Sequence, residues 1–139
     1  MDYFSLIKDI LNEKNKTITD LEQDKVVKKN VVYEFKYCCP SLPNIISIAN
    51  YLEVSIDYIL ENTTENNFQR YNVEQKNIYK KLIEILKAEN LSQLKFCKDL
   101  AISRTNFSRW NNGATPKLST LIDIAKYLNC KIDELLDRE

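Results

Sequence analysis

Histidine is absent from this sequence, and glycine occurs once and proline three times in its 139 residues. Without histidine the chain lacks the side chain that most often serves as a general base and as a zinc ligand. No nucleophile–base pair, phosphate-cradling glycine loop or carboxylate cluster takes its place. An enzyme is therefore the least favoured class of function, and we expect no cofactor.

The scarcity of glycine and proline removes most of the usual turn chemistry between strands. No alternating apolar and polar run bounded by glycine turns is present either. We therefore predict an all-α fold whose helices are joined by short turns.

Long apolar runs are also missing. No stretch approaches the ~20 residues that a membrane span needs, and the N-terminal residues lack the basic and apolar segments of a signal peptide. We therefore expect a cytoplasmic protein that does not contact a membrane. The cysteines, Cys38, Cys39, Cys97 and Cys130, form no C-x-x-C pair, so we expect no metal site.

Charge is balanced over the whole chain but is unevenly distributed. Residues 1–66 contain 7 Lys and Arg against 11 Asp and Glu, whereas residues 67–139 contain 13 against 9. The second half is therefore the basic half, which is the sign of charge expected for binding a polyanion.

The sequence also repeats itself. Residues 42–60 align with residues 118–136 at an offset of 76, and Ala, Tyr, Leu, Ile and Asp recur at matching positions. Upstream, Leu6 pairs with Leu82 at the same offset, and in between the best register is 75. Identical residues at this density indicate an internal duplication. We therefore predict two tandem units of about 60 residues each, near the lower limit for independent folding.

The expected boundaries are 1–62 for the first unit, 63–72 for a polar linker and 73–139 for the second unit. Phe68 and Tyr71 can attach the linker to a domain surface. Each unit is expected to contain five short helices, which in the second unit span 73–89, 93–100, 104–112, 118–128 and 132–138. Asn72 and Gln75 have the spacing of a capping box for the first of these helices.

Residues 92–117 are the most informative segment. They read as a short helix, a tight turn and a second helix that ends at Gly113, the only glycine. Ser92 and Ser103 suit the N-cap positions, and glycine suits the left-handed position after a helix end. The second helix of such a pair can lie in the major groove of DNA.

This unit resembles the phage-repressor helix-turn-helix family, the lambda repressor and Cro class, also called XRE-type. The matching residues are Gln93, Cys97, Ala101, Ile102, Ser103, Phe107, Ser108, Trp110, Asn112, Gly113 and Pro116, and the resemblance covers nearly all of residues 75–139. Ala101 stands where the family often has glycine. A left-handed alanine costs roughly 1 kcal/mol, so the turn is still expected to form.

The resemblance implies a set of DNA contacts. The residues concerned are Gln93, Lys95, Lys98, Arg104, Thr105, Asn106, Arg109, Asn112 and Lys117. Arg104 and Thr105 would reach base edges, and Arg109 a further base or a phosphate. Gln93 would meet a phosphate and Asn112 the DNA backbone, whereas Asn106 is a borderline contact. The lysines would add salt-dependent attraction.

The first unit reads as a degraded copy in which residues 27–36 align with the recognition helix. Lys29 and Asn30 stand at the places of Arg104 and Thr105, and Glu34 at the place of Arg109. A glutamate facing phosphates is repelled, so Lys29 and Asn30 are expected to form at most a weaker second DNA site. Exposed tyrosines in this segment would suit a protein contact instead.

The resulting expectation is a sequence-specific DNA-binding transcriptional regulator, in the first place a repressor, that binds double-stranded DNA. Family members are common in phages and mobile elements and often act as dimers, so the first unit could serve a homodimer, a protein partner or a second DNA half-site. The competing hypothesis is a protein-interaction module on a helix-turn-helix scaffold, such as an antirepressor or an inhibitor of a host protein.

Overall fold

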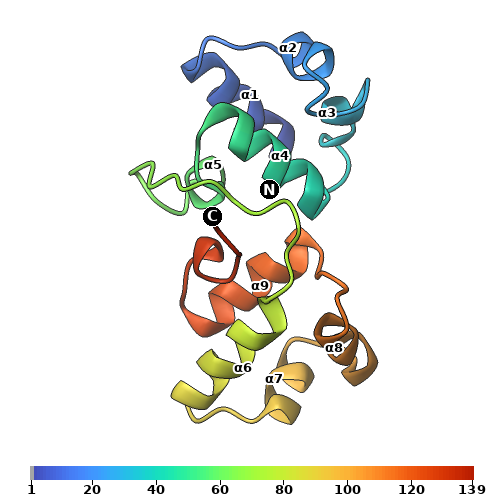
Figure 1. The fold of residues 1–139 in the computed structure, drawn as a ribbon, viewed down its shortest axis with the longest axis vertical. Helices are drawn as coiled ribbons and strands as arrows, with labels where there is room; N and C mark the ends of the chain where they lie inside the picture. The colour runs from blue at the N-terminus through green and yellow to red at the C-terminus, as the bar shows by residue number, and fades with distance from the viewer. Residues whose placement is uncertain (1) are drawn as a thin grey trace. The chain divides into compact units, whose positions relative to one another are not determined.

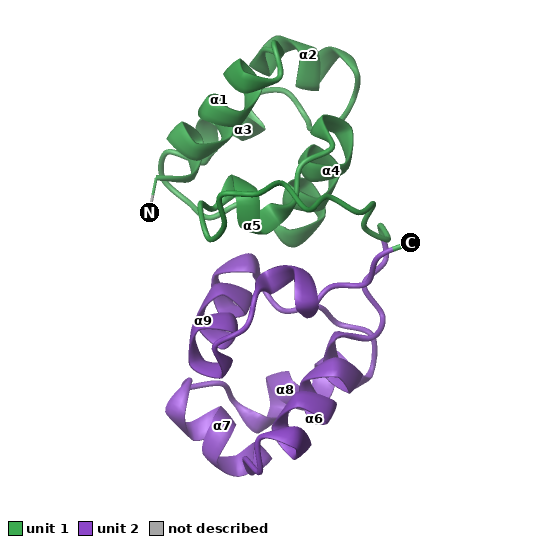
Figure 2. Ribbon diagram, turned by 90° about the vertical axis from the view of Figure 1, so that its left-hand side faces the viewer, with its two compact units in different colours: residues 1–73, 139 green, residues 74–138 purple. Residues whose placement is uncertain are grey.

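The computed structural model describes residues 2–139 and divides them into two compact units (Figures 1 and 2). Unit 1 runs to Val73 and includes Glu139, and unit 2 is Glu74–Arg138. The described residues form nine α-helices and one 3-10 helix and no strand, which confirms the all-α prediction. The longest of these helices have eleven residues, too few to cross a bilayer.

Unit 1 contains the first five helices. They are α1 (Tyr3–Glu13), α2 (Ile18–Gln23), α3 (Val31–Glu34), α4 (Leu42–Leu52) and α5 (Ile56–Ile59). Side chains of Asp2, Thr17, Ser41 and Ser55 accept hydrogen bonds from first-turn amides and so fix where four of the helices begin. Helix α4 contributes the largest number of buried residues, seven, to the unit's core.

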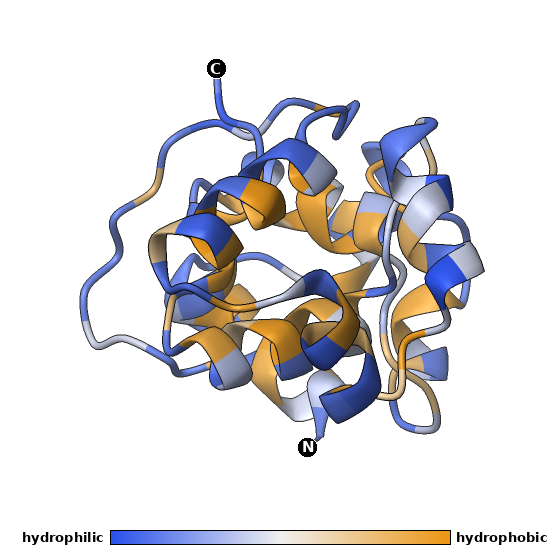
Figure 3. Ribbon diagram, turned by 90° about the horizontal axis from the view of Figure 1, so that it is seen from below, coloured by the Kyte–Doolittle hydropathy of each residue, from blue (hydrophilic) through white to orange (hydrophobic). Residues whose placement is uncertain are grey.

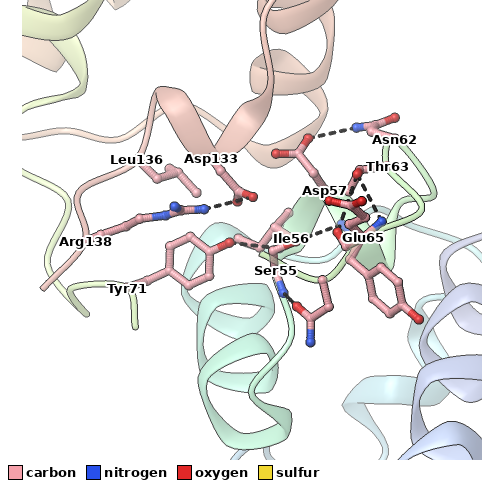
Figure 4. Close-up of polar contacts among 12 residues, drawn as sticks. Ser55, Ile56, Asp57, Asn62, Thr63, Glu65, Tyr71, Asp133, Leu136 and Arg138 are labelled. Carbon is pink, nitrogen blue, oxygen red and sulfur yellow. Dashed lines mark hydrogen bonds and ion pairs between the residues drawn. The ribbon is translucent and has the colours of Figure 1, made fainter. Parts of the chain in front are cut away.

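The segment expected to be a linker, residues 63–72, lies within unit 1. Tyr71 is fully buried, and its backbone N–H and carbonyl both bond the Asn50 side chain, at 2.9 and 3.0 Å. The Tyr71 hydroxyl accepts from the N–H of Ile56 at 2.8 Å, at the start of α5 (Figure 4). The aromatic ring can be buried only if the backbone that carries it is ordered, so the end of this segment belongs to the core.

Unit 2 contains the remaining helices. They are α6 (Ile78–Ala88), α7 (Gln93–Asp99), α8 (Arg104–Asn111), α9 (Leu118–Leu128) and the 3-10 helix η1 (Ile132–Glu134). Helices α7, α8 and α9 begin at the residues expected from the sequence or next to them. Apolar segments gather in the interior of the helical units and polar segments lie outside (Figure 3).

The expectation for the first helix of unit 2 was wrong. Helix α6 begins at Ile78, not near residue 73, and its N-cap is Asn77, so Asn72 and Gln75 do not cap this helix. Gln75 is buried and exchanges two hydrogen bonds with the backbone of Asp137, at 3.1 and 2.6 Å. The last expected helix, 132–138, is correspondingly cut to the single turn of η1, because the backbone of Asp137 is bonded to Gln75.

Asp137 takes over the role of the missing cap. Its carboxylate accepts from the backbone N–H groups of Lys76 (2.9 Å) and Asn77 (3.0 Å), just before α6, and pairs with the Lys81 ammonium at 3.1 Å. Burial alone would raise the pKa of Asp137, but the hydrogen bonds from Lys81 and the two amides outweigh it and lower the pKa. Asp137, near the C-terminal end of unit 2 in sequence, thus fixes the start of α6, the first helix of the unit.

The two units share several features at nearly constant spacing. Buried Ile7 and Leu11 correspond to buried Leu82 and Leu86 at an offset of 75, so the offset of 76 predicted for the first helix was wrong. Asn15 and Asn90, both left-handed, follow the same offset. Thus the shift to an offset of 76 occurs after the first helix.

A tyrosine–aspartate hydrogen bond also occurs once in each unit. The Tyr127 hydroxyl on α9 donates to Asp99 at the end of α7 at 2.7 Å, and Tyr51 on α4 donates to Asp24 just after α2. These bonds raise the pKa of Tyr127, and that of Tyr51 to about 12. Both phenols therefore remain protonated and hold the second helix of their unit against the fourth.

Replacing Ala101 with glycine is expected to stabilise unit 2 by about 0.5–1 kcal/mol. Ala101, in the turn between α7 and α8, has φ +54°, where a Cβ is strained and glycine is not. The gain is partly offset because glycine loses more entropy on folding. Urea unfolding followed by the fluorescence of Trp110, the only tryptophan, measures it. Ala114→Gly, in a loop at negative φ, is the control and should show no gain; a destabilised Ala101→Gly contradicts the prediction.

Candidate nucleic-acid interface

Local signals position α7 and α8. Ser92 Oγ accepts from the N–H of Lys95 and Ser103 Oγ from that of Asn106, both at 3.1 Å, which confirms both predicted caps. Between the helices, left-handed Ala101 reverses the chain. Helix α8 ends at Asn111, and Gly113 follows at φ +101°, in the conformation expected of it.

Aromatic packing holds α8 by its inner face. Phe107 and Trp110 are buried, with Phe107 centred 5.7 Å from Phe96 of α7 and 5.1 Å from Tyr79 of α6. Phe107 and Trp110 themselves meet edge to face at 5.6 Å. Residues three apart occupy one side of a helix, so these contacts decide which side of α8 is left to solvent.

The outer face of α8 is polar and accessible. At 3.6 residues per turn, the positions opposite the buried aromatics belong to Thr105, Ser108, Arg109 and Asn112, all of which are exposed. Arg104 and Asn106, also exposed, flank this face on either side. Ser108 was not among the expected contact residues. Its spacing of three residues after Thr105 and four before Asn112 is the sequence signal that places it there.

The α7–α8 segment is strongly basic. Between residues 92 and 117 the cations are Lys95, Lys98, Arg104, Arg109 and Lys117, and Asp99 is the single acid. Asp99 already accepts the Tyr127 hydroxyl. None of the five cations forms an ion pair with any residue of the described range 2–139. Their charge is therefore available to an external anion.

Arg104 also affects the pKa of a buried residue, Cys97. Burial raises the pKa of the Cys97 thiol on α7, and the positive charge of Arg104 opposes that rise. Cys97 is therefore a protonated core residue near the start of α8, and not a reactive thiolate.

A groove brings three of the expected residues together. An open cavity of about 390 Å³ lies between the α7–α8 turn, α8, the loop 114–117 and α9. Asn106, Arg109 and Lys117 line it, together with Thr120 and Asp123 of α9. Gln93 and Lys95 lie in the first turn of α7, are exposed, and do not line this groove.

The counterpart in unit 1 is different. The expected placement of Lys29 and Asn30 in the first turn of a recognition helix is wrong, because α3 begins only at Val31 and consists of four residues. Asn30 is left-handed at φ +68°, and its N–H donates to Glu22 at 2.7 Å. No serine stands at the place of Ser103, so no cap starts the helix earlier.

Comparison with known proteins bears on one part of the chain. A family model described as a Cro/C1-type HTH DNA-binding domain matches residues 81–139, and it shows no second copy in unit 1. Searches of curated proteins and of solved structures gave no significant match. No catalytic domain was found, and residues 2–139 contain no group of three or more potential metal ligands. Residues 81–139, which include α7 and α8, are therefore one Cro/C1-type helix-turn-helix domain.

Proposed function

We propose that this protein is a sequence-specific DNA-binding transcriptional regulator, acting as a repressor, whose helix α8 reads the major groove. The observation that carries the proposal is the outer face of α8, which is exposed, polar and free of ion pairs within residues 2–139. The family match to a DNA-binding domain supports it independently. Such a protein represses transcription when the DNA site that it binds overlaps a promoter.

The proposed contacts divide by the chemistry of the side chains. Arg104 and Arg109 can each bond guanine O6 and N7 with two donors, and Thr105 can bond a base edge between them. Lys95, Lys98 and Lys117, with Gln93, Asn106 and Asn112, are assigned to phosphates around this face. Phosphate contacts fix the register of the helix on the duplex, whereas the base contacts select the sequence.

We infer that unit 1 is a diverged copy of the same unit. The equivalent order of helices, the paired left-handed asparagines and the repeated tyrosine–aspartate bond support this origin. Its α3 has shrunk to one turn and carries Glu34, so the reading function is assigned to unit 2 alone.

Replacing either arginine is expected to weaken binding to the preferred site by about 5- to 150-fold, equivalent to roughly 1–3 kcal/mol per bidentate contact. The preferred site is obtained by selecting bound duplexes from a random pool with the full chain. Arg104→Ala and Arg109→Ala should then relax the preference at one base position each. Arg70→Ala, an exposed arginine of unit 1, is the control and should keep the preference.

Two outcomes contradict the proposal. Unchanged selectivity in both arginine variants would exclude base reading by α8. A pool that shows no enrichment, together with a protein that co-purifies specifically with the chain, would favour the interaction-module hypothesis, to which the exposed Tyr33 and Tyr37 of unit 1 are suited.

A further inference from the structure

We propose that unit 1 binds the phosphate backbone of duplex DNA through Lys25, Lys28 and Lys29, without reading bases. The protein would then hold DNA with one reading domain and one sequence-independent anchor. The inference rests on the proposed function in one respect: it assumes that unit 2 brings the chain to DNA.

A lysine-lined groove in unit 1 provides the geometry. An open cavity of about 470 Å³ lies between the α2–α3 turn and the first turn of α4. It is lined by Glu22, Lys25, Val26, Val27, Lys28, Lys29 and Asn44. The groove of unit 2 occupies the equivalent place, since left-handed Lys25 corresponds to left-handed Ala101, and Asn44 to Thr120, at an offset of 76.

The charges at this groove favour an anion. All three lysines are exposed, and none forms an ion pair within residues 2–139. Three lysines line the groove against a single carboxylate, that of Glu22, which accepts the N–H of Asn30. A local positive surface therefore remains on a unit whose first 66 residues carry more acidic than basic side chains.

The same region lacks the means to read bases. Helix α3 has only four residues, and left-handed Asn30 precedes it. This helix is therefore too short to present several side chains to base edges. If α3 entered the major groove of DNA, the exposed Glu34 would repel a phosphate or a base-edge acceptor. Lysine ammonium groups act as point charges and attract phosphates whatever the sequence.

Duplex DNA is the favoured partner because the anchor and the reading domain belong to one chain. Once unit 2 is bound, unit 1 meets nearby DNA at a high effective concentration, so even a weak contact adds to the overall affinity. An acidic protein would fit the same lysines but would gain nothing from the presence of unit 2.

The test compares the full chain with the variant Lys25→Gln/Lys28→Gln/Lys29→Gln. Binding to a random-sequence duplex and to the selected duplex is measured by fluorescence anisotropy over a range of KCl concentrations. We expect the slope of log K against log [KCl] to become shallower by about two to three, since each lost phosphate contact changes it by about 0.9. Both affinities should fall by a similar factor, and their ratio should stay that of the wild type.

The matched control is Lys8→Gln/Lys14→Gln/Lys36→Gln, which removes the same charge from unit 1 outside the groove. Its salt slope should stay close to that of the wild type, and circular dichroism should show both variants folded. An unchanged slope in the groove variant overturns the anchor and favours an acidic protein partner. An equal change in the control also overturns it, because the net charge of unit 1 would then suffice.

The anchor and the regulator hypothesis can fail separately. A wild-type chain without sequence preference contradicts the regulator, yet its salt slope on the random duplex still reports whether the three lysines contact phosphates. Conversely, a selective wild-type chain whose slope does not depend on these lysines keeps the regulator and loses the anchor.

Discussion

Replacing Phe96 with alanine should unfold most of unit 2 at room temperature. The Phe96 side chain is fully buried and centred 5.7 Å from Phe107 and 5.8 Å from Tyr127, so it joins α7 to both α8 and α9. Removing a buried phenylalanine costs about 3–5 kcal/mol. A domain of this size has few kcal/mol to lose. The α8 surface should therefore lose the proposed DNA affinity, although none of the proposed contact residues changes.

Urea unfolding followed by Trp110 fluorescence measures this loss, since that tryptophan packs on the same aromatic cluster. Leu94→Ala is the matched control, because Leu94 lies on α7 but is 61% exposed. It should change the free energy of unfolding by less than about 0.5 kcal/mol. An unfolding midpoint for Phe96→Ala close to that of the wild type would show that the cluster does not support α8.

Replacing Asp137 with alanine should destabilise unit 2 by about 2–4 kcal/mol. The change removes acceptors for two backbone amides and leaves the ammonium of Lys81, 30% exposed, with only the Leu136 carbonyl. Hydrogen bonds to charged groups contribute about 1.5–3 kcal/mol, and breaking a buried ion pair costs more because the partner is left uncompensated. The expected result is an earlier urea transition with an unchanged slope.

The variant Asp137→Asn separates the charge of the side chain from its shape. The folded-state pKa of Asp137 is lowered from 3.8, so its charge stabilises unit 2 fully above that value, and the contribution is lost as pH falls through the folded pKa. Asp137→Asn should therefore be clearly less stable than the wild type at pH 7. The difference should shrink as the pH falls through the folded-state pKa of Asp137, below which both side chains are neutral. A gap that persists there would assign the effect to packing.

Local signals were enough to predict the helices of unit 2 that form the proposed DNA interface. Ser92, Ser103 and Gly113 mark where helices begin and end, and the spacing of Phe107 and Trp110 marks the inner face of α8. Each of these signals acts within four residues along the chain. The outer face followed from them, although Ser108 was overlooked.

Features that depend on distant residues could not be predicted in this way. The start of α6 depends on Asp137, about 60 residues further along the chain, so Asn72 and Gln75 gave a false cap. Tyr71 looked like a linker residue because its partners, Asn50 and Ile56, are far away in the sequence. In unit 1, the alignment with unit 2 did not reveal that the helix has shrunk to one turn.

The left-handed residues of this chain show how a glycine-poor sequence makes its turns. Within residues 2–139, eight residues other than glycine adopt positive φ, and only four of these are asparagine, the next most tolerant residue. Lys25, Glu53, Glu61 and Ala101 carry the rest. Each of them adds a small amount of backbone strain to the folded state. The chain thus forms these turns without glycine, the residue that adopts positive φ with the least strain. Glycine at any of these four positions would therefore relieve backbone strain in the folded state.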